Sequence, residues 1–186
     1  MRTFIAIALD PVIKKNLSDF LGRLIKLGPK NISWVREEGM HLTLKFLGEI
    51  KDAQVSIIKN ITNSVSKKYP RFPLIVRGTG YFPANPKYLR VLWVGVEEQP
   101  ALMGLQKELE SELDKLGFPR EKRAFHPHLT LGRVRAPSNL KEILEELEKN
   151  KMAALGEMSV QKITFFQSRL KPTGAEYTAL AESELS

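Results

Sequence analysis

The tetrapeptide His-Leu-Thr-Leu occurs twice in the chain, beginning at His41 and again at His128. These are two of only three histidines in 186 residues, so the repetition is hard to attribute to chance. Successive side chains of a β-strand point to opposite faces. Each copy therefore predicts a strand with a histidine and a threonine (Thr43 or Thr130) on one face and two leucines on the other. The leucine face suits a core, and the other face suits a polar ligand.

Two imidazoles that face one another can perform acid–base chemistry. An unperturbed histidine has a pKa of about 6.5, so near neutrality one ring can accept a proton while the other donates one. Such a pair suits cleavage of a phosphodiester. The base takes a proton from an attacking water, and the acid protonates the oxygen that leaves on the opposite side of phosphorus. The hydroxyls of Thr43 and Thr130 can donate hydrogen bonds to the non-bridging phosphate oxygens.

The elements around the two motifs follow one order twice: strand, helix, motif strand, helix, strand. In the first half we expect a strand over 2–9, a helix from Asp10-Pro11 to Gly28, the motif strand over 41–46, a helix from about 52 and a strand over 72–80. In the second half we expect a strand over 89–96, a helix over 100–116, the motif strand over 127–133, a helix from about 139 and a strand over 160–166. Corresponding elements begin about 87 residues apart, which is the separation of the two histidines.

Repetition of this order at one offset indicates an internal duplication. We expect an α+β protein that forms a single bilobal domain over 1–186, with repeat halves of about 2–80 and 89–167. Each lobe is expected to be a small antiparallel sheet with helices outside. A pseudo-twofold arrangement would bring the two motif strands face to face in one cleft. Trp34 and Trp93 are assigned to the core.

Composition limits the classes of function. The chain has 29 basic and 21 acidic residues and a net charge of +8, which suits an anionic partner such as RNA or a nucleotide, or serves solubility alone. The absence of cysteine excludes disulfides, a thiolate nucleophile and cysteine metal sites. No stretch approaches the roughly 18 apolar residues of a membrane span, and the first ten residues do not resemble a signal peptide. We expect a cytoplasmic protein that contacts no membrane, and a monomer, although the sequence leaves the oligomeric state open.

The context of the motifs resembles the 2H phosphoesterase superfamily. Within it, four segments are similar to the RNA 2′,3′-cyclic phosphodiesterases, also called 2′-5′ RNA ligases. They are Met-Arg-Thr-Phe-Ile-Ala at 1–6, Gly-Tyr-Phe-Pro at 80–83, Arg-Val-Leu-Trp at 90–93 and Phe-His-Pro-His-Leu-Thr-Leu-Gly-Arg at 125–133. The likeness runs to Ser-Arg-Leu at 168–170 and so covers nearly the whole chain.

The resemblance implies an enzyme that needs no metal or other cofactor and opens a 2′,3′-cyclic phosphate at an RNA end to a 2′-phosphomonoester. It implies that His41 donates the proton to the leaving oxygen and that His128 accepts the proton of the attacking water. Thr43 and Thr130 then correspond to the phosphate-binding threonines. The resemblance also implies reversible 2′-5′ joining of tRNA halves. The alternative is a non-catalytic protein whose paired motifs hold the phosphate of RNA or a nucleotide.

Three further residues are candidates for substrate binding. Lys45 shares the strand parity of His41 and could reach a phosphate, or it could be a solvated lysine at the strand end. Arg133 corresponds to an arginine usual in the family, but its parity places it on the opposite face, so it needs a strand end or a bulge to reach the substrate. Phe82, with Tyr81 in an expected loop over 81–86, could stack on a base or simply pack.

The third histidine permits a rival chemistry. His126 and His128 share one strand face, and with His41 they could form the three-histidine set of a catalytic zinc site. Zinc would leave the duplicated threonines unexplained, so we expect His126 at the rim of the site. The basic stretch 120–123 could contact RNA phosphates or be a solvated run of charge.

Overall fold

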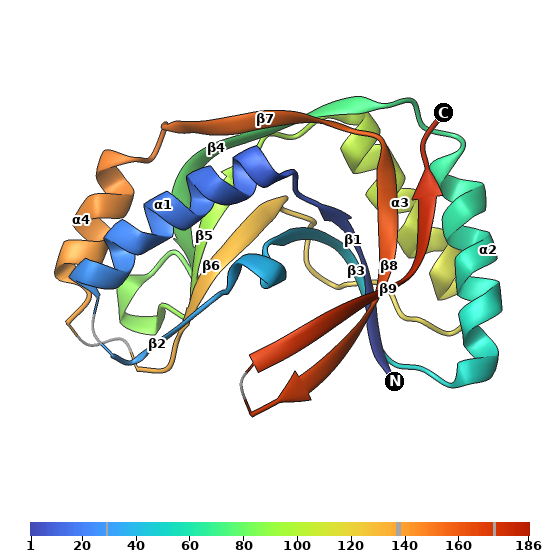
Figure 1. The fold of residues 1–186 in the computed structure, drawn as a ribbon, viewed down its shortest axis with the longest axis horizontal. Coiled ribbons are helices and arrows are strands. Elements are labelled where there is room, and N and C mark those ends of the chain that lie inside the picture. The colour runs from blue at the N-terminus through green and yellow to red at the C-terminus, as the bar shows by residue number, and fades with distance from the viewer. Residues whose placement is uncertain (29, 137–138, 173) are drawn as a thin grey trace.

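A computed structural model describes residues 1–28, 30–136, 139–172 and 174–186, and it contains two antiparallel sheets (Figure 1). The strands are β1 (Arg2–Ala8), β2 (Ile32–Trp34), β3 (His41–Glu49), β4 (Phe72–Phe82), β5 (Val91–Val96), β6 (His128–Val134), β7 (Ala154–Val160), β8 (Lys162–Lys171) and β9 (Gly174–Glu184). The helices are α1 (Pro11–Leu27), α2 (Val55–Ser66), α3 (Pro100–Asp114) and α4 (Lys141–Lys149), with 3₁₀ turns η1 (Glu37–Gly39), η2 (Asp52–Gln54) and η3 (Pro86–Tyr88).

The start of α1 illustrates how the local sequence determines these elements. The Asp10 carboxylate accepts a hydrogen bond from the backbone N–H of Ile13 at 2.7 Å, and proline occupies the first turn, where its missing N–H costs nothing. The helix buries one apolar face that includes Leu17 and Leu24. The predicted helix start at Asp10-Pro11 is therefore confirmed.

The two lobes are built around a four-stranded sheet, ordered β3-β1-β8-β9, and a five-stranded sheet, ordered β2-β6-β5-β4-β7. All pairings between neighbouring strands are antiparallel. Helices α2 and α3 pack together beside the four-stranded sheet, whereas α1 and α4 lie together beside the five-stranded sheet (Figure 1). The expected α+β fold with two antiparallel lobes and outer helices is confirmed.

The lobes do not coincide with the two halves of the chain. Strand β4 from the first half pairs with β5 of the second, and β8 from the second half pairs with β1 of the first. Each half thus gives its last repeated strand to the other lobe. Five pairs correspond (β1/β5, α1/α3, β3/β6, α2/α4 and β4/β8), and their members begin 86 to 90 residues apart. This exchange was not predicted.

The structure differs from the sequence expectation at β4 and at β7. Strand β4 continues through Phe82, so Tyr81 and Phe82 belong to a strand and not to a loop. Strand β7, along the outer edge of β4, was not predicted. Most of its side chains are exposed or half-buried, and its sequence, Ala-Leu-Gly-Glu-Met-Ser-Val, does not alternate clearly between apolar and polar residues. An edge strand of this kind lacks the pattern that a buried strand shows.

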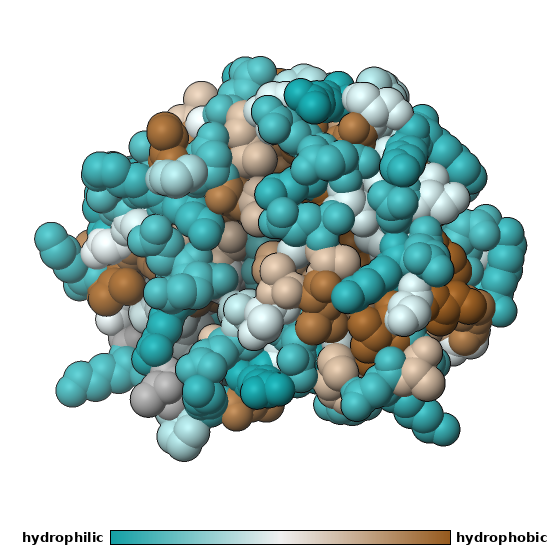
Figure 2. Space-filling view, turned by 45° about the vertical axis from the view of Figure 1, so that its right-hand side comes forward, coloured by the Kyte–Doolittle hydropathy of each residue, from teal (hydrophilic) through white to brown (hydrophobic). Residues whose placement is uncertain are grey.

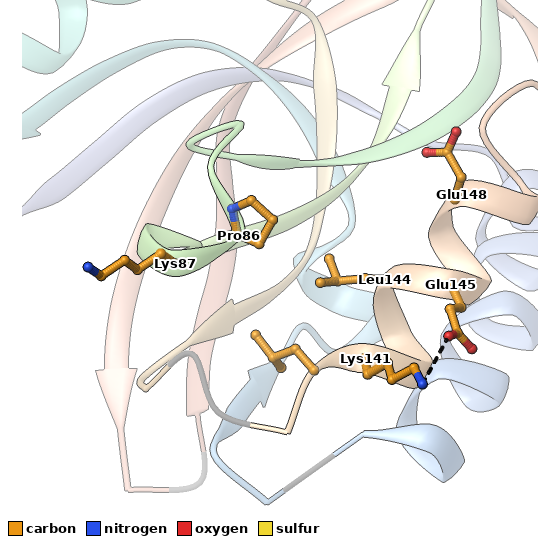
Figure 3. A pocket seen from close by; sticks show the side chains of 7 residues that line it. Pro86, Lys87, Lys141, Leu144, Glu145 and Glu148 are labelled. Atoms are coloured by element: carbon orange, nitrogen blue, oxygen red, sulfur yellow. Dashed lines mark ion pairs between the residues drawn. The ribbon is translucent and has the colours of Figure 1, made fainter.

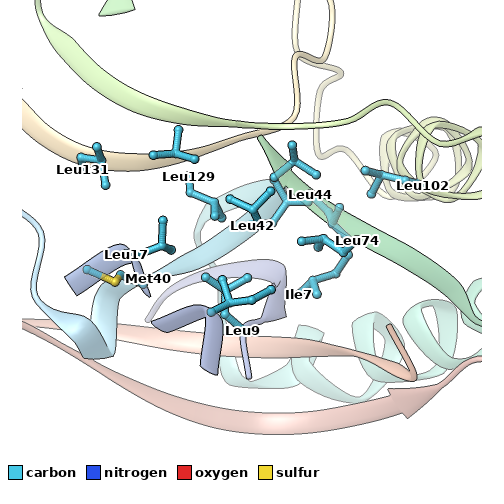
Figure 4. Close-up of a cluster of buried hydrophobic side chains, with 14 of the residues drawn as sticks. Ile7, Leu9, Leu17, Met40, Leu42, Leu44, Leu74, Leu102, Leu129 and Leu131 are labelled. Atoms are coloured by element: carbon cyan, nitrogen blue, oxygen red, sulfur yellow. The ribbon is translucent and has the colours of Figure 1, made fainter. Parts of the chain in front are cut away.

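The leucines of both motifs lie in one core between the lobes (Figure 4). Leu42, Leu44, Leu129 and Leu131 are each at most 3% exposed. This shared core fixes the orientation of both motif strands, because the side chains that alternate with the leucines must point away from it.

The outer surface is different in character. The face seen in Figure 2 is mostly hydrophilic, with hydrophobic side chains confined to smaller patches. Within the described residues, no helix is both long and apolar enough to cross a membrane.

Candidate active site

The motif strands β3 and β6 contact each other across the boundary between the lobes. With their leucines in the shared core, His41, Thr43, His128 and Thr130 lie on the opposite side of these strands, and each is half-buried. We call the side that bears these four residues the motif face. It draws one histidine and one threonine from each lobe.

A β-bulge follows each motif at the same place. In the pairing of β1 with β3, Leu44 has no partner, and in the pairing of β5 with β6, Leu131 has none. An extra residue of this kind reverses the alternation of the side chains beyond it. Both strands accordingly have the same order of buried and exposed positions from the histidine onward, with two buried residues in succession at the bulge.

The bulge brings Arg133 to the motif face. Its side chain is exposed. Burial is the main cause of the lowered pKa of His128, and the positive charge of Arg133 lowers that pKa further. Burial raises the pKa of Tyr177, and the charge of Arg133 opposes this increase. From the sequence, Arg133 could reach the face of His128 only at a strand end or beyond a bulge. The structure contains such a bulge, at Leu131. The corresponding position after the first motif is Phe46, which is 64% exposed.

The bulge in β3 turns Lys45 away from the motif face. Its ammonium group donates to the Glu110 carboxylate and to the Pro119 carbonyl, both at 2.6 Å, and its side chain is only 3% exposed. Lys45 therefore joins β3 to α3 and to the segment that leads toward the second motif. The prediction that Lys45 contacts a phosphate is wrong, because it assumed unbroken alternation along the strand.

His128 has a defined tautomer. Its Nδ1–H donates to the backbone carbonyl of His126 at 2.7 Å, since a carbonyl can only accept. The lone pair of the neutral ring is then at Nε2. Burial lowers the pKa of His128, the hydrogen bond to His126 opposes this change, and the charge of Arg133 adds to it. The ring is suited to accept a proton at Nε2.

His41 is surrounded by aromatic side chains. Its ring stacks on Phe4 with centroids 4.7 Å apart, and Tyr177 approaches it edge-on at 5.3 Å. Phe166 lies 6.1 Å away. Burial, and secondly the positive charge of Lys14, lower the pKa of His41 to about 4.

A chain of neighbours connects the two histidines. Tyr177, on β9, lies beside His41. It is also close enough to Arg133 on β6 for the positive charge of that arginine to oppose the increase in the pKa of Tyr177 that burial causes. Arg133 in turn acts on His128. The structure thus brings four sequence-predicted residues (His41, His128 and their threonines) together with Arg133.

The threonine hydroxyls are available to a ligand. Among the described residues, neither Thr43 nor Thr130 has a hydrogen-bond partner for its side chain, and both are half-buried. A ligand with oxygen acceptors could accept hydrogen bonds from both without displacing a protein partner.

Phe82 lies directly beside His128, with ring centroids 5.2 Å apart in an edge-on arrangement. The Trp93 ring packs against Phe82 with centroids 5.0 Å apart, and its centroid is 6.5 Å from that of His128. The sequence analysis assigned Trp93 to the core, but this side chain lies at the site. Gly80 makes this possible, because a Cβ at that position would be 2.3 Å from the Trp93 ring.

The three histidines are not arranged as the ligands of a zinc ion. His126 is exposed, and its backbone carbonyl, not its ring, contacts His128. Within the described ranges, which include all three histidines, no group of three His, Cys, Asp or Glu residues is placed to hold a metal ion.

Sequence reasoning missed several residues of the site: Lys14, Phe4, Phe166 and Tyr177. Phe4 and Phe166 lie on two of the strands that the sequence predicted, so alternation along those strands could have indicated the face that each occupies. In the structure they are directly paired across β1 and β8. Lys14 and Tyr177 come from α1 and β9, and only the tertiary fold brings them to His41.

A surface hollow of about 560 Å³ lies elsewhere, between α4 and the segment around η3 (Figure 3). It is lined by Leu144 and Lys141 of the helix and by Pro86 and Lys87 of the segment opposite. It contains neither motif histidine.

Comparisons with known proteins agree with this arrangement. The family described as "LigT like Phosphoesterase" matches twice, over residues 7–93 and 94–177. A protein of Thermotoga maritima is 38% identical over 185 residues, covering 99% of this chain and 95% of its own. One of Methanothermobacter thermautotrophicus is 35% identical over 178 residues, covering 96% and 95%. Both are named RNA 2′,3′-cyclic phosphodiesterase. Among solved structures, TT0787 of Thermus thermophilus matches with a TM-score of 0.83 and 26% identity, covering 100% of this chain and 98% of that one.

Proposed function

Because the chain belongs to the LigT-like phosphoesterase family, we propose that it hydrolyses the 2′,3′-cyclic phosphate at an RNA end to a 2′-phosphomonoester. The observation that supports this most strongly is the pair of identical motif strands. Each orients a histidine and a threonine toward one face and is followed by the same bulge. The names of the curated relatives supply the substrate class.

His128 is the proton acceptor in this proposal. With Nδ1–H fixed on the His126 carbonyl, Nε2 takes a proton from water as the water oxygen attacks phosphorus. Its lowered pKa keeps the ring neutral, and therefore able to accept a proton, at neutral pH.

His41 is the proton donor. As the bond between phosphorus and the 3′ oxygen breaks, His41 gives its proton to that oxygen, which becomes the 3′ hydroxyl. The free protein disfavours the imidazolium, because the ring is buried and Lys14 is near. A bound phosphodiester carries negative charge next to the ring, which raises the pKa of His41 and allows it to hold the proton that it must donate.

The remaining groups of the motif face bind the substrate. Thr43 and Thr130 donate hydrogen bonds to the non-bridging oxygens, whose charge must be stabilised in the transition state. Arg133, exposed and close to His128, supplies positive charge to the same oxygens. Phe82, at the edge of His128, contacts the base. These roles need no metal ion and no other cofactor.

The same groups can also join RNA ends. With a 5′ hydroxyl in place of water, His128 takes the proton of that hydroxyl, the 5′ oxygen bonds to phosphorus, and the 3′ oxygen leaves with the proton of His41, so that the product is a 2′-5′ linkage. In the reverse reaction, which cleaves this linkage, the acid and the base exchange roles, and tRNA halves are substrates of the right kind. The side chains invoked all come from one chain, so the proposed reaction needs no second copy, and we propose a monomer. We also propose that it acts in the cytoplasm, as the sequence led us to expect.

Hydrolysis of a nucleoside 2′,3′-cyclic phosphate in the presence of excess EDTA tests the proposal. We expect the 2′-phosphate and not the 3′-phosphate as product, with a rate that EDTA does not change. Loss of activity with EDTA would contradict the metal-independent mechanism. A protein that binds the nucleotide and an RNA end without hydrolysing either would be the phosphate-binding alternative.

A further inference from the structure

We propose that Arg135 and Ser33 form a second phosphate subsite, which binds the phosphate on the 5′ side of the terminal nucleotide. The inference rests on the proposed function and names the substrate more closely. It makes RNA of at least two nucleotides, and not a free cyclic mononucleotide, the preferred substrate.

Register places both residues on the motif face. Ser33 of β2 lies directly opposite Arg133 of β6, so their side chains share one face of the sheet. Arg135 is two residues beyond Arg133, and its Nε–H donates to the Ser33 hydroxyl oxygen at 3.0 Å. That hydrogen bond could not form if Arg135 pointed to the other face.

The spacing fits a nucleotide chain. Residues two apart in a strand are about 7 Å from each other, which is close to the separation of successive phosphates in an extended single strand. A row of groups thus runs along β6 from His128 and Thr130 to Arg133 and then Arg135. In the proposed function Arg133 contacts the cyclic phosphate, so the next phosphate of the RNA, one step further along the nucleotide chain, comes to Arg135.

The positive charge in this region is not neutralised. Among the described residues, no carboxylate lies within 4 Å of the guanidinium of Arg133 or Arg135. The hydrogen bond to Ser33 occupies only one of the five N–H groups of Arg135.

The test compares two substrates that share the cyclic phosphate and differ in whether a further nucleoside and its phosphate precede the terminal nucleoside. One is a nucleoside 2′,3′-cyclic phosphate, and the other is a dinucleotide that ends in the same group. We expect kcat/KM to be at least about tenfold higher for the dinucleotide, since a hydrogen bond to a charged group contributes on that order. In Arg135→Gln the ratio of the two values should fall to about one. Ser33→Ala, which removes only the partner of Arg135, should lower the ratio by a smaller factor.

A matched control and a neutral substrate make the result specific. Arg71→Gln removes an exposed arginine near the C-terminus, where the Arg71 backbone N–H bonds the Ser186 carbonyl, and it should leave the ratio unchanged. A dinucleotide whose internal phosphate is a neutral methylphosphonate should lose its advantage with the wild-type protein.

Three results would overturn the subsite: no preference in the wild type, a preference that survives Arg135→Gln, or an equal loss in Arg71→Gln. A wild-type protein inert toward both substrates would instead overturn the proposed function, and the subsite with it. Activity on the mononucleotide therefore distinguishes the two failures.

Discussion

The two motif histidines have the same neighbours in sequence but different surroundings in the fold. His41 lies among Phe4, Phe166 and Tyr177, and burial is the first cause of its low pKa. His128 has a backbone carbonyl that fixes its tautomer. The tetrapeptide alone assigns no roles, because these differences come from other strands and from His126.

The pH dependence of kcat/KM follows from these pKa values. The active free enzyme needs one protonated and one neutral histidine. With the pKa of His41 near 4 and that of His128 also lowered, we expect a bell with its maximum below pH 6.5. In Lys14→Gln the loss of a positive charge raises the pKa of His41. The low-pH limb of the bell should then move to higher pH, and the maximum should rise.

The control for this prediction is Lys15→Gln on the same helix, where Lys15 is paired with Asp19 and does not influence His41. Measured pH–rate profiles that shift equally in both variants, or in neither, would show that Lys14 does not act on His41. A maximum above pH 7 in the wild type would contradict the environment assigned to both histidines.

At the scale of the element, one inserted residue in each motif strand decides which side chains reach the substrate. Parity correctly predicted which face of the strand the two histidines and two threonines occupy, because these residues lie before the bulges. It failed at Lys45, and for Arg133 it could only state the condition that a bulge would have to meet. Gly132 follows the unmatched Leu131, and a glycine within a strand can mark a bulge. The unmatched Leu44 is followed by Lys45 and has no such local signal, so the pairing of β3 with β1 was needed to reveal its bulge.

The buried pair of Lys45 and Glu110 should contribute strongly to stability. Removing one partner leaves the other charge buried, so Lys45→Met should lower the free energy of unfolding by about 3–5 kcal/mol. The double variant Lys45→Met/Glu110→Met leaves neither charge and should recover much of the loss. Denaturant unfolding measures both.

The exposed pair of Lys15 and Asp19 is the comparison, and Lys15→Met should cost about 0.5 kcal/mol or less. If Lys45→Met costs no more than that, the ion pair is not the joint between β3 and α3 that the distances indicate. A double variant less stable than the single one would show that packing, and not charge, is lost.

At the scale of the whole molecule, the repeat was visible in the sequence but its topology was not. The offset of about 87 residues predicted two lobes, and we infer that the halves of about 2–80 and 89–167 are copies of one unit. An element order does not say which sheet a strand joins, so the exchange of β4 and β8 could not be seen. Strand β7, at an edge with few buried side chains, was missed for a local reason.

The exchange predicts that neither half folds alone. A fragment of residues 1–84 contains β4 without β5, and a fragment of 85–186 contains β8 without β1. Each fragment alone should lack a cooperative thermal transition, and mixing the two should restore both a transition and hydrolysis. Circular dichroism on the separate and mixed fragments measures this. Cooperative unfolding of either fragment by itself would contradict the exchange.

The division of labour between the histidines is the central claim, and one measurement tests it most directly. It compares kcat/KM for wild type, His41→Ala and His128→Ala on a 2′,3′-cyclic phosphate and on an analogue with sulfur as the 3′ bridging atom. A thiolate leaves without needing a proton, so the analogue no longer requires an acid.

We expect each variant to lose at least about a hundredfold on the oxygen substrate. On the sulfur analogue, His41→Ala should recover most of its loss, whereas His128→Ala should recover none. Recovery by His128→Ala instead would reverse the two roles. Equal losses by both variants on both substrates would contradict the account of His41 as the donor of a proton to the leaving oxygen.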